Sequence, residues 1–280
     1  MDEYPITPED WADIFAIIKA DRTIGLFPEA PPRFYLHAGQ PGCGKTEVNN
    51  LVKAQLDGNI LECNADNLRD YHPDVDKILR EREAEYPNLT WTAANRWNKA
   101  LIDEGISHRY HLLIETTLHD QELALVTFAR MKQHGYTTNL QVLAVPYRWS
   151  WLGIHLRYEA LKSRKGFARR VSEADHDLRY NQLPGSLRAI IDSPDLDHVV
   201  IYRRMLKIGA GAHTAIELVT DQKADALGAF HQVIGQKMDD AESALFQSEC
   251  ARVIEYMTNR SASVEEMQAF SRKAHRLASE

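Results

Sequence analysis

The segment HAGQPGCGKTEVNN, from His37 to Asn50, constrains the fold more than any other part of the chain. It places Gly39, Gly44, Lys45 and Thr46 at the spacing G-x-x-x-x-G-K-T. The apolar stretch 33–38 before it predicts a strand, and residues 45–57 predict a helix that Gly58 ends. A glycine-rich loop between a strand and a helix turns its backbone N–H groups inward, where they bind phosphate oxygens.

This loop is therefore the candidate nucleotide-binding element. Lys45 is expected to reach the β- and γ-phosphates, and the Thr46 hydroxyl to ligate Mg²⁺. Cys43 holds a position that contributes mainly backbone, and we interpret it as a small filler. The loop alone leaves open whether phosphate passes to water, as in motors and switches, or to a hydroxyl, as in kinases. We assign ATP, with GTP as the alternative nucleotide, to Gly39, Gln40, Pro41, Gly42, Cys43, Gly44, Lys45 and Thr46.

The order of the remaining elements predicts the fold class. Short apolar stretches typical of buried strands alternate with helical stretches, and they lie at 33–38, 59–64, 111–115, 139–145 and 198–202. This alternation predicts an α/β fold, a P-loop kinase-like parallel sheet flanked by helices on both faces. An N-terminal helix is expected where Thr7 provides a cap and Pro8 the first helical residue.

The C-terminal part of the sequence has a different pattern. From about Ala212 onward it shows helical spacing and no strand pattern, and Ser263 with Glu266 forms a capping box before a last helix. We therefore predict a kinase domain over 1–205, including the N-terminal helix, and a helical C-terminal extension over 206–280.

Charge and composition narrow the class of partners. The net charge of −7 provides no overall basic field that would draw the chain to polymeric nucleic acid or to anionic lipid. No apolar run approaches the length of a membrane span. The three cysteines form no disulfide framework, and the acidic N-terminus has no secretory signal. We expect a soluble cytoplasmic protein.

Two acids lie at predicted strand ends, where parallel sheets place their ligands. Asp66 follows the second strand and is suited to accept the proton of an acceptor hydroxyl. The alternative is that Asn64 or Asp66 caps a short helix that His72 ends. Glu115 ends the third strand, where an acid assists Mg²⁺ or water in motors and holds acceptor hydroxyls in small-molecule kinases; a carboxylate with no specific role is the alternative. Hydrogen-bonding side chains follow on the same rim: Thr116, Thr117 and His119.

Arginines follow in the next part of the chain. Phosphoryl transfer requires cations around the γ-phosphate, and arginine supplies a planar fork of donors. Arg157 lies on a predicted amphipathic helix, and Arg169 and Arg170 follow Gly166, an arrangement that fits a lid. Arg164 and Lys165 are interpreted as a solvated basic face. For the dipeptide His176-Asp177 a structural hydrogen bond is favoured over an acid–base role.

Together these motifs resemble those of the zeta toxin family, the P-loop kinases of toxin–antitoxin systems. The segments GQPGCGKT, NADNLRDYHP and LLIETTLHD look like the family's loop, its acid with a following His-Pro, and its Ile-Glu-x-Thr strand end. LAVP, LGIHLRYE, ARR and the HD before NQLP follow in the family's order. The resemblance covers about Arg33 to Tyr202.

The resemblance implies an ATP-dependent kinase that phosphorylates UDP-N-acetylglucosamine on the 3'-hydroxyl of the amino sugar and so drains a cell-wall precursor. Position by position, it implies that Lys45 binds the phosphates, that Asp66 is the base, and that Arg157 and Arg169 clamp the γ-phosphate. It also implies a small helical antitoxin that blocks the nucleotide site. The helices after about Ala212 lie outside the shared core, and three roles stay open for them: ordinary packing, a substrate cap or an inhibitory helical segment within the chain. The implied sugar-nucleotide site consists of Glu115, Thr117 and Thr127, with His119 on the same rim.

Two positions depart from the family pattern and bear on the acceptor. His119 stands where the family often has arginine, and Lys99 stands where it tends to have an acid. Both are expected to face substrate, so a kinase of another nucleotide, a nucleic-acid end or an antibiotic is the second hypothesis. The third is a P-loop module that binds nucleotide and signals through its C-terminal helices. The base at Asp66 and the clamp arginines argue against the third.

Overall fold

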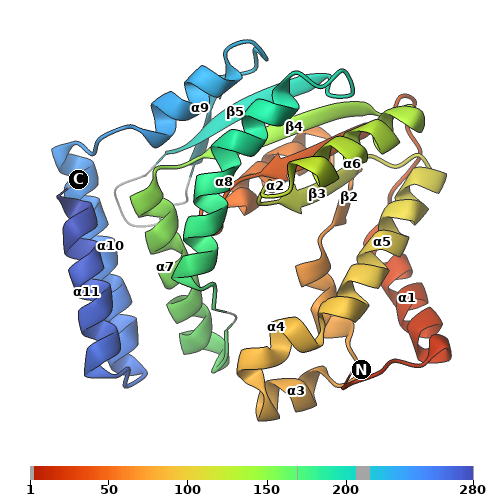
Figure 1. The fold of residues 1–280 in the computed structure, drawn as a ribbon. Helices are drawn as coiled ribbons and strands as arrows, with labels where there is room; N and C mark the ends of the chain where they lie inside the picture. Colours follow the sequence, from red (N-terminus) through yellow and green to blue (C-terminus); the bar gives the residue numbers. More distant parts are fainter. Residues whose placement is uncertain (1–2, 169, 206–214, 280) are drawn as a thin grey trace.

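The computed structural model of the chain describes residues 3–168, 170–205 and 215–279, and its centre within these residues is a six-stranded sheet (Figure 1). The strand order is β2-β3-β1-β4-β5-β6. The first five strands are parallel, and β6 pairs antiparallel with β5. The bounds are β1 (Arg33–Ala38), β2 (Leu61–Cys63), β3 (Leu112–Thr116), β4 (Thr137–Ala144), β5 (His198–Met205) and β6 (Ala215–Thr220).

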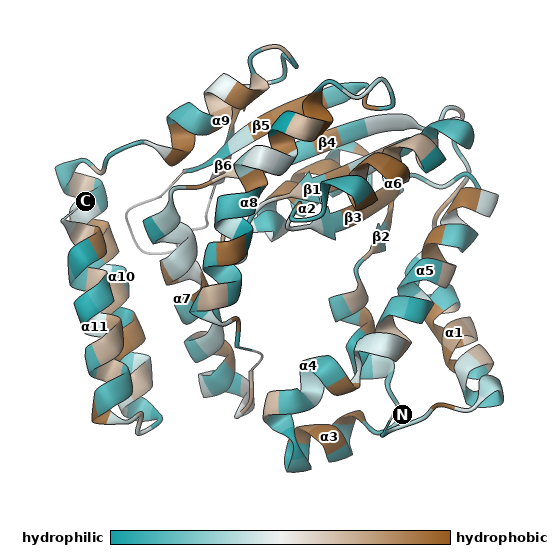
Figure 2. Ribbon diagram, viewed as in Figure 1, coloured by the Kyte–Doolittle hydropathy of each residue, from teal (hydrophilic) through white to brown (hydrophobic). Residues whose placement is uncertain are grey.

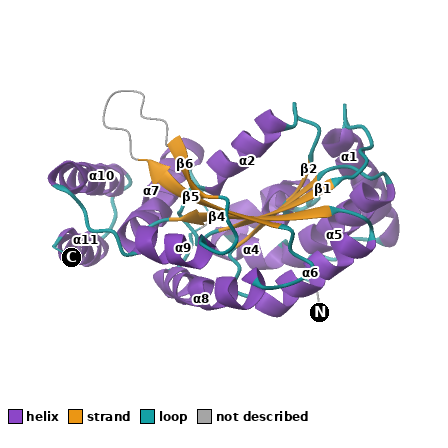
Figure 3. Cartoon of the chain, turned by 90° about the horizontal axis from the view of Figure 1, so that it is seen from above, coloured by secondary structure: helices purple, strands orange, loops and turns teal. Residues whose placement is uncertain are grey.

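Helices cover both faces of this sheet (Figure 3). On one face α2 (Lys45–Gln55) packs on β1 and β4; the other face carries α5 (Trp91–Ser107), α6 (Gln121–Gln133), α8 (Glu173–Ile191) and α9 (Ala226–Ile234). Successive residues of β1 point to opposite faces, so Phe34 and Leu36 join the larger core and Tyr35 clusters with Val52 of α2. The predicted α/β architecture, with helices on both faces of a mostly parallel sheet, is confirmed.

The chain between β2 and β3 runs away from the sheet and returns along α5 (Figure 1). It forms η1 (Ala65–Tyr71), α3 (Val75–Glu81), η2 (Glu83–Glu85) and α4 (Tyr86–Leu89). The N-terminal helix α1 (Pro8–Thr23) packs against β2 and η1. Its predicted cap is confirmed, because Thr7 Oγ1 accepts a hydrogen bond from the Asp10 N–H at 3.1 Å.

A helical hairpin packs on the outer side of α7 (Tyr147–Lys165) (Figure 1). It consists of α10 (Asp240–Asn259) and α11 (Val264–Ala278). Both helices mix hydrophobic and hydrophilic residues, as is typical of amphipathic helices with one buried face (Figure 2). Trp151 of α7 stacks on Phe270 of α11 with ring centroids 5.1 Å apart. The predicted capping box begins α11, where the Glu266 N–H donates to Ser263 Oγ at 3.2 Å.

The prediction that the chain after about Ala212 is helical throughout is wrong for Ala215–Thr220, which form β6. This edge strand is short, Glu217 and Leu218 in it are exposed, and it pairs only with β5 within the described residues. A short, partly exposed strand gives a weak pattern in the sequence. The following helix α9 packs against β5 and contributes Phe230 to the main core. No helix within the described residues is long and apolar enough to cross a bilayer.

Candidate active site

The loop between β1 and α2 has the backbone of a phosphate cradle. Gly42 and Gly44 have φ of 78° and 97°, in the left-handed region that favours glycine, and Gly44 directly precedes α2. Lys45 Nζ donates to Gly39 O at 2.7 Å and to Gln40 O at 3.4 Å, so its charge lies against the loop. Thr46 is exposed in the first turn of α2.

These residues fit a nucleoside triphosphate with Mg²⁺. The positive end of the α2 dipole and its first N–H groups face the loop, as anion binding requires. Lys45 would hold the phosphates and Thr46 would ligate the metal ion. The strand, loop and helix stand in the order expected from the sequence.

Two contacts brace the loop against β4 and α7. Gln40 Nε2 donates to Val145 O at 2.7 Å, just beyond β4. A Cβ atom placed on Gly153 of α7 would lie 2.1 Å from Gly42 O, so the two backbones touch. Cys43 is buried in this packing, and burial raises the pKa of its thiol. Its position agrees with its interpretation as a filler.

Glu115 is tied to α2 through Asn49. The register of β1 and β3 pairs Glu115 with His37. Asn49 Nδ2 donates to Glu115 Oε1 at 2.5 Å and to Glu62 Oε1 at 3.4 Å. Asn49 Oδ1 therefore accepts, and His37 Nδ1, 2.6 Å away, carries the proton. Burial lowers the pKa of His37 to about 4, so the imidazole is neutral and the network orients Glu115 toward α2.

The structure separates the two roles considered for the segment after β2. Asn64 is the N-cap of η1, and its Oδ1 accepts from the Asp66 N–H at 2.9 Å. The Asp66 carboxylate instead pairs with Arg69, whose Nε donates to Asp66 Oδ1 at 2.8 Å. The Asp66 side chain is 42% exposed. Asp66 thus keeps an exposed carboxylate at the same edge of the sheet as the phosphate loop, and His72 ends η1 as predicted.

The other residues expected around the acceptor are less closely gathered. Thr117 Oγ1 and His119 Nδ1 lie 2.9 Å apart just after β3. Thr127 is half-buried on α6, and its hydroxyl donates to Leu123 O at 2.7 Å within the same helix. Lys99 is exposed on α5. The geometry therefore places Thr117 and His119 on the rim next to Glu115, and Thr127 and Lys99 on the neighbouring helices.

The arginines divide into different environments. Arg157 is exposed on α7, which ends at Gly166 in a left-handed conformation. Arg169 lies outside the described residues. Arg170 faces the C-terminal hairpin, where its NH1 lies 3.3 Å from Glu266 Oε1. Arg164 is exposed, as expected for a solvated face.

His176 has a structural role, as favoured from the sequence. It is buried, its Nε2 lies 2.9 Å from Ser150 Oγ, and its Nδ1 lies 3.0 Å from Asp177 Oδ1. Tyr147 donates to the same Asp177 oxygen at 2.7 Å. These bonds join α7 to α8.

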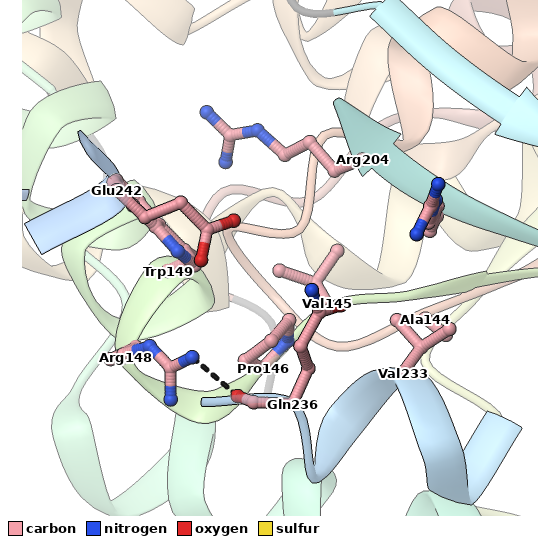
Figure 4. Close-up of a pocket in the computed structure, with 10 residues that line it drawn as sticks. Ala144, Val145, Pro146, Arg148, Trp149, Arg204, Val233, Gln236 and Glu242 are labelled. Carbon is pink, nitrogen blue, oxygen red and sulfur yellow. Dashed lines mark hydrogen bonds between the residues drawn. The ribbon is translucent and has the colours of Figure 1, made fainter. Parts of the chain in front are cut away.

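Two hollows flank the candidate site. The first lies beyond the carboxyl ends of β4 and β5, next to the residue that anchors Gln40, and Arg148 and Arg204 line it together with Glu242 (Figure 4). Arg148 donates there to the backbone of Gln236, and burial lowers the pKa of Arg204. The second hollow has a volume of about 370 Å³ and lies between η1, α3 and α4 on one side and the end of α7 on the other. Its lining includes Asp70, Tyr86, Leu161 and Phe167.

Sequence reasoning missed three residues of this arrangement: His37, Asn49 and Arg69. His37 carried a signal, because a polar residue in an otherwise apolar strand before a phosphate loop is unusual. Asn49 follows Lys45 by four residues and so lies on the same helix face. Arg69 follows Asp66 by three residues, a spacing that could have indicated the pair, but its anchors Pro87 and Thr90 come from the distant α4–α5 segment.

Comparison with known families agrees with this geometry. The family model described as zeta toxin matches residues 20–209. The chain belongs to the zeta toxin family. The family expected from the sequence motifs is thereby confirmed. Two curated family members are similar to it: Toxin zeta of Enterococcus hirae, 28% identical over 177 residues, and Toxin PezT of Streptococcus pneumoniae, 29% identical over 174 residues. The alignments span 63% and 62% of this chain, and 62% and 69% of the two relatives.

Two solved structures share the fold, one over nearly the whole chain and the other more distantly. A structure from the PezAT chromosomal toxin–antitoxin system of Streptococcus pneumoniae superposes with a TM-score of 0.81 at 23% identity, covering 91% of this chain and 100% of that one. The AvrRxo1-ORF1:-ORF2 structure with ATP reaches a TM-score of 0.50 at 13% identity, covering 95% and 81%. The P-loop kinase-like fold of this zeta toxin family member is therefore confirmed.

Proposed function

We propose that this zeta toxin family member is an ATP-dependent kinase that transfers a phosphoryl group to an alcohol of a small molecule. The observation that carries the proposal is the exposed carboxylate of Asp66 at the edge of the sheet that bears Lys45 and Glu115. A motor or switch delivers phosphate to water, whereas a kinase needs a base beside the acceptor hydroxyl. The alternative role for Asp66 was to cap η1, but Asn64 provides that cap.

Each residue then has a defined task. Bound Mg²⁺–ATP supplies the phosphoryl group. Lys45 and the loop N–H groups hold the phosphates and offset their charge, and Thr46 ligates the metal ion. Asp66 accepts the proton of the acceptor hydroxyl, and Glu115, fixed by Asn49, accepts hydrogen bonds from neighbouring acceptor hydroxyls. Arg157 and Arg169 are proposed to approach the γ-phosphate.

The acceptor that we propose is UDP-N-acetylglucosamine, phosphorylated at the 3'-hydroxyl of the sugar. Family membership supports it, as does the rim formed by Glu115, Thr117 and His119. Thr127, on α6, is the fourth residue that we assign to this acceptor. We place the reaction in the cytoplasm and assign the protein as the toxin of a toxin–antitoxin pair. Its relatives carry the name toxin, and the similar PezAT structure is described as a toxin–antitoxin system.

The partner that we propose is a small helical antitoxin that blocks the nucleotide site. The alternative was an inhibitory helical segment within the chain. The α10–α11 hairpin packs on α7 through Trp151 and Phe270, which favours a structural task for it over inhibition.

The experiment that tests this function is a screen of acceptors with radiolabelled ATP. Wild-type protein is expected to transfer the label to UDP-N-acetylglucosamine, and the Lys45→Ala variant is not. Label found in inorganic phosphate only, with none in any acceptor, would contradict the kinase. Expression of the wild type should arrest bacterial growth, expression of Lys45→Ala should not, and arrest by both variants would contradict toxicity through phosphotransfer.

A second acceptor class is favoured by His119 and Lys99, which depart from the family pattern and are both exposed. The same screen covers other nucleotides, nucleic-acid ends and antibiotics. Label that enters one of these in preference to UDP-N-acetylglucosamine identifies that class as the substrate.

A further inference from the structure

A buried arginine holds the carboxylate of Asp66. Only 3% of the Arg69 side chain is exposed, and its Nε donates to Asp66 Oδ1 at 2.8 Å. Its NH1 donates to Thr90 Oγ1 at 3.0 Å and also to Pro87 O. The guanidinium lies over the Trp91 ring, 5.2 Å from the centroid. One guanidinium therefore joins η1 to the α4–α5 segment.

These contacts fix the direction of the guanidinium. A buried charge is costly unless an opposite charge and hydrogen-bond acceptors compensate it. Pro87 O and Thr90 Oγ1 satisfy one nitrogen, and Asp66 provides the opposite charge. Because the donors of arginine form a rigid planar fork, anchoring NH1 also sets where Nε points. Asp66 is thus held by Arg69 Nε, whose position is determined by the anchors Pro87 and Thr90.

The helix type strengthens this pairing. Ala65–Tyr71 form a 3₁₀ helix rather than an α-helix. Residues three apart eclipse in a 3₁₀ helix, so Arg69 stands directly over Asp66. The pair has one buried member and one with 42% of its side chain exposed. Arg69 is the buried member, so it can influence an acceptor only through the exposed carboxylate of Asp66.

Other charged or titratable groups surround η1. Arg22 of α1 donates to Asn67 O at 3.2 Å, and Tyr86 of α4 donates to Asp70 Oδ1 at 2.7 Å. Tyr71 of η1 donates to Asp21 of α1 at 2.5 Å. These groups take part in bonds of their own, whereas Arg69 contacts the Asp66 carboxylate itself.

We propose that Arg69 is a positioning residue for phosphotransfer, which keeps the Asp66 carboxylate ionised and aimed at the acceptor hydroxyl. The inference rests on the proposed function of Asp66 as the base. In that step the acceptor O–H bond breaks and its proton passes to Asp66. The acceptor oxygen bonds to the γ-phosphorus, and the bond from that phosphorus to ADP breaks with its electron pair leaving on ADP. Arg69 itself touches no reacting atom.

The kinetic test compares Arg69→Met with a control variant, Thr90→Val. Arg69→Met removes the charge, and we expect kcat to fall about 10- to 100-fold, a part of the contribution of a general base. The acidic limb of the pH profile of kcat/KM should move up by up to about 1 pH unit, because a carboxylate that is 42% exposed, and so partly screened by solvent, loses its neighbouring cation. The KM for ATP should stay unchanged. Thr90→Val removes one anchor and no charge, so its acidic limb should stay in place.

A conservative variant separates charge from geometry. Arg69→Lys keeps the charge without the fork of donors, so we expect it to restore the acidic limb and only part of kcat. It also serves if Arg69→Met does not fold. A merely structural role predicts instead that the Arg69 and Thr90 variants lose stability together and leave the pH profile unmoved. That result would overturn the inference.

A titration without acceptor distinguishes this inference from the proposed function. In the full-length protein, ¹³C NMR follows the Asp66 carboxyl group, assigned by its absence in Asp66→Asn. We expect a higher titration midpoint in Arg69→Met than in the wild type, whatever the acceptor. Equal midpoints overturn the inference even if the protein is a kinase. A raised midpoint in a protein that phosphorylates no acceptor preserves the Arg69–Asp66 coupling and contradicts the kinase.

Discussion

The contact between Gly42 and Gly153 predicts that one added methyl group disables the phosphate loop. In Gly153→Ala the new Cβ would lie 2.1 Å from Gly42 O and 3.0 Å from Gly42 C. Ordinary C···O contacts are about 3.3 to 3.6 Å, so the backbones must separate by roughly 1 Å. The obstacle is backbone on both sides, because a Cβ on Gly42 would in turn lie 2.1 Å from Ser150 O.

The size of the effect follows from this overlap. Overpacking of this kind costs about 1 to 3 kcal/mol. Replacing glycine by alanine within a helix offsets about 1 kcal/mol of it. The loop is the part that can move, and a shift of about 1 Å in a positioned group can cost on the order of 100-fold in rate. We therefore expect Gly153→Ala to bind Mg²⁺–ATP at least about tenfold more weakly, which corresponds to about 1.4 kcal/mol.

Calorimetric titration of ATP and urea unfolding measure the two effects. The matched control is Gly228→Ala in α9, where the new Cβ meets nothing within 4 Å among the described residues. The control should gain about 0.5 to 1 kcal/mol of stability and bind ATP as the wild type does. The reasoning is refuted if Gly153→Ala also gains stability and keeps full ATP affinity.

Three further predictions concern buried groups. Because burial lowers the pKa of His37 to about 4, the unfolded chain binds more protons than the native state between about pH 6.5 and 4. The contribution of neutral His37 to stability, at most about 3 kcal/mol, is complete above pH 6.5 and declines as the pH falls from about 6.5 to 4. Urea unfolding should therefore show a smaller loss of stability over this range for His37→Gln than for the wild type. Arg260→Met leaves the buried Glu159 without its bidentate partner, and thermal unfolding should show a loss of about 3 kcal/mol; an unchanged midpoint would contradict the pairing. Burial raises the pKa of Cys43, so a thiol reagent at pH 8 should label it only after unfolding, and rapid labelling of the native protein would favour a redox role.

The parts of the fold that could be predicted from the sequence are those with a local cause. The strand before the phosphate loop, β1, is buried on both faces, so its apolar run stands out, and Gly42 and Gly44 of the loop have left-handed backbone. The short edge strand β6 lacks such a signal because Glu217 and Leu218 are exposed and its register comes from β5. Without a strand signal at β6, the sequence pattern predicts a wholly helical C-terminal part.

The candidate site shows the same limit. Lys45, Asp66 and Glu115 could be placed at one edge because parallel strands end together. The contact of Asn49 with Glu115 and the anchoring of Arg69 by Thr90 join segments far apart in the chain. Only the folded chain brings Asn49 to Glu115 and fixes the direction of the Arg69 guanidinium beside Asp66.

The most direct measurement of the central claim is a single-turnover reaction followed by mass spectrometry. Wild-type protein, in excess over UDP-N-acetylglucosamine, is mixed with Mg²⁺–ATP and compared with Asp66→Asn and Lys45→Ala. We predict a product one phosphate heavier with the wild type and formation slowed about 10²- to 10⁴-fold in Asp66→Asn, the contribution of a general base, while ATP binding is unchanged. Full transfer by Asp66→Asn would contradict the assignment of the base and with it this account of the site.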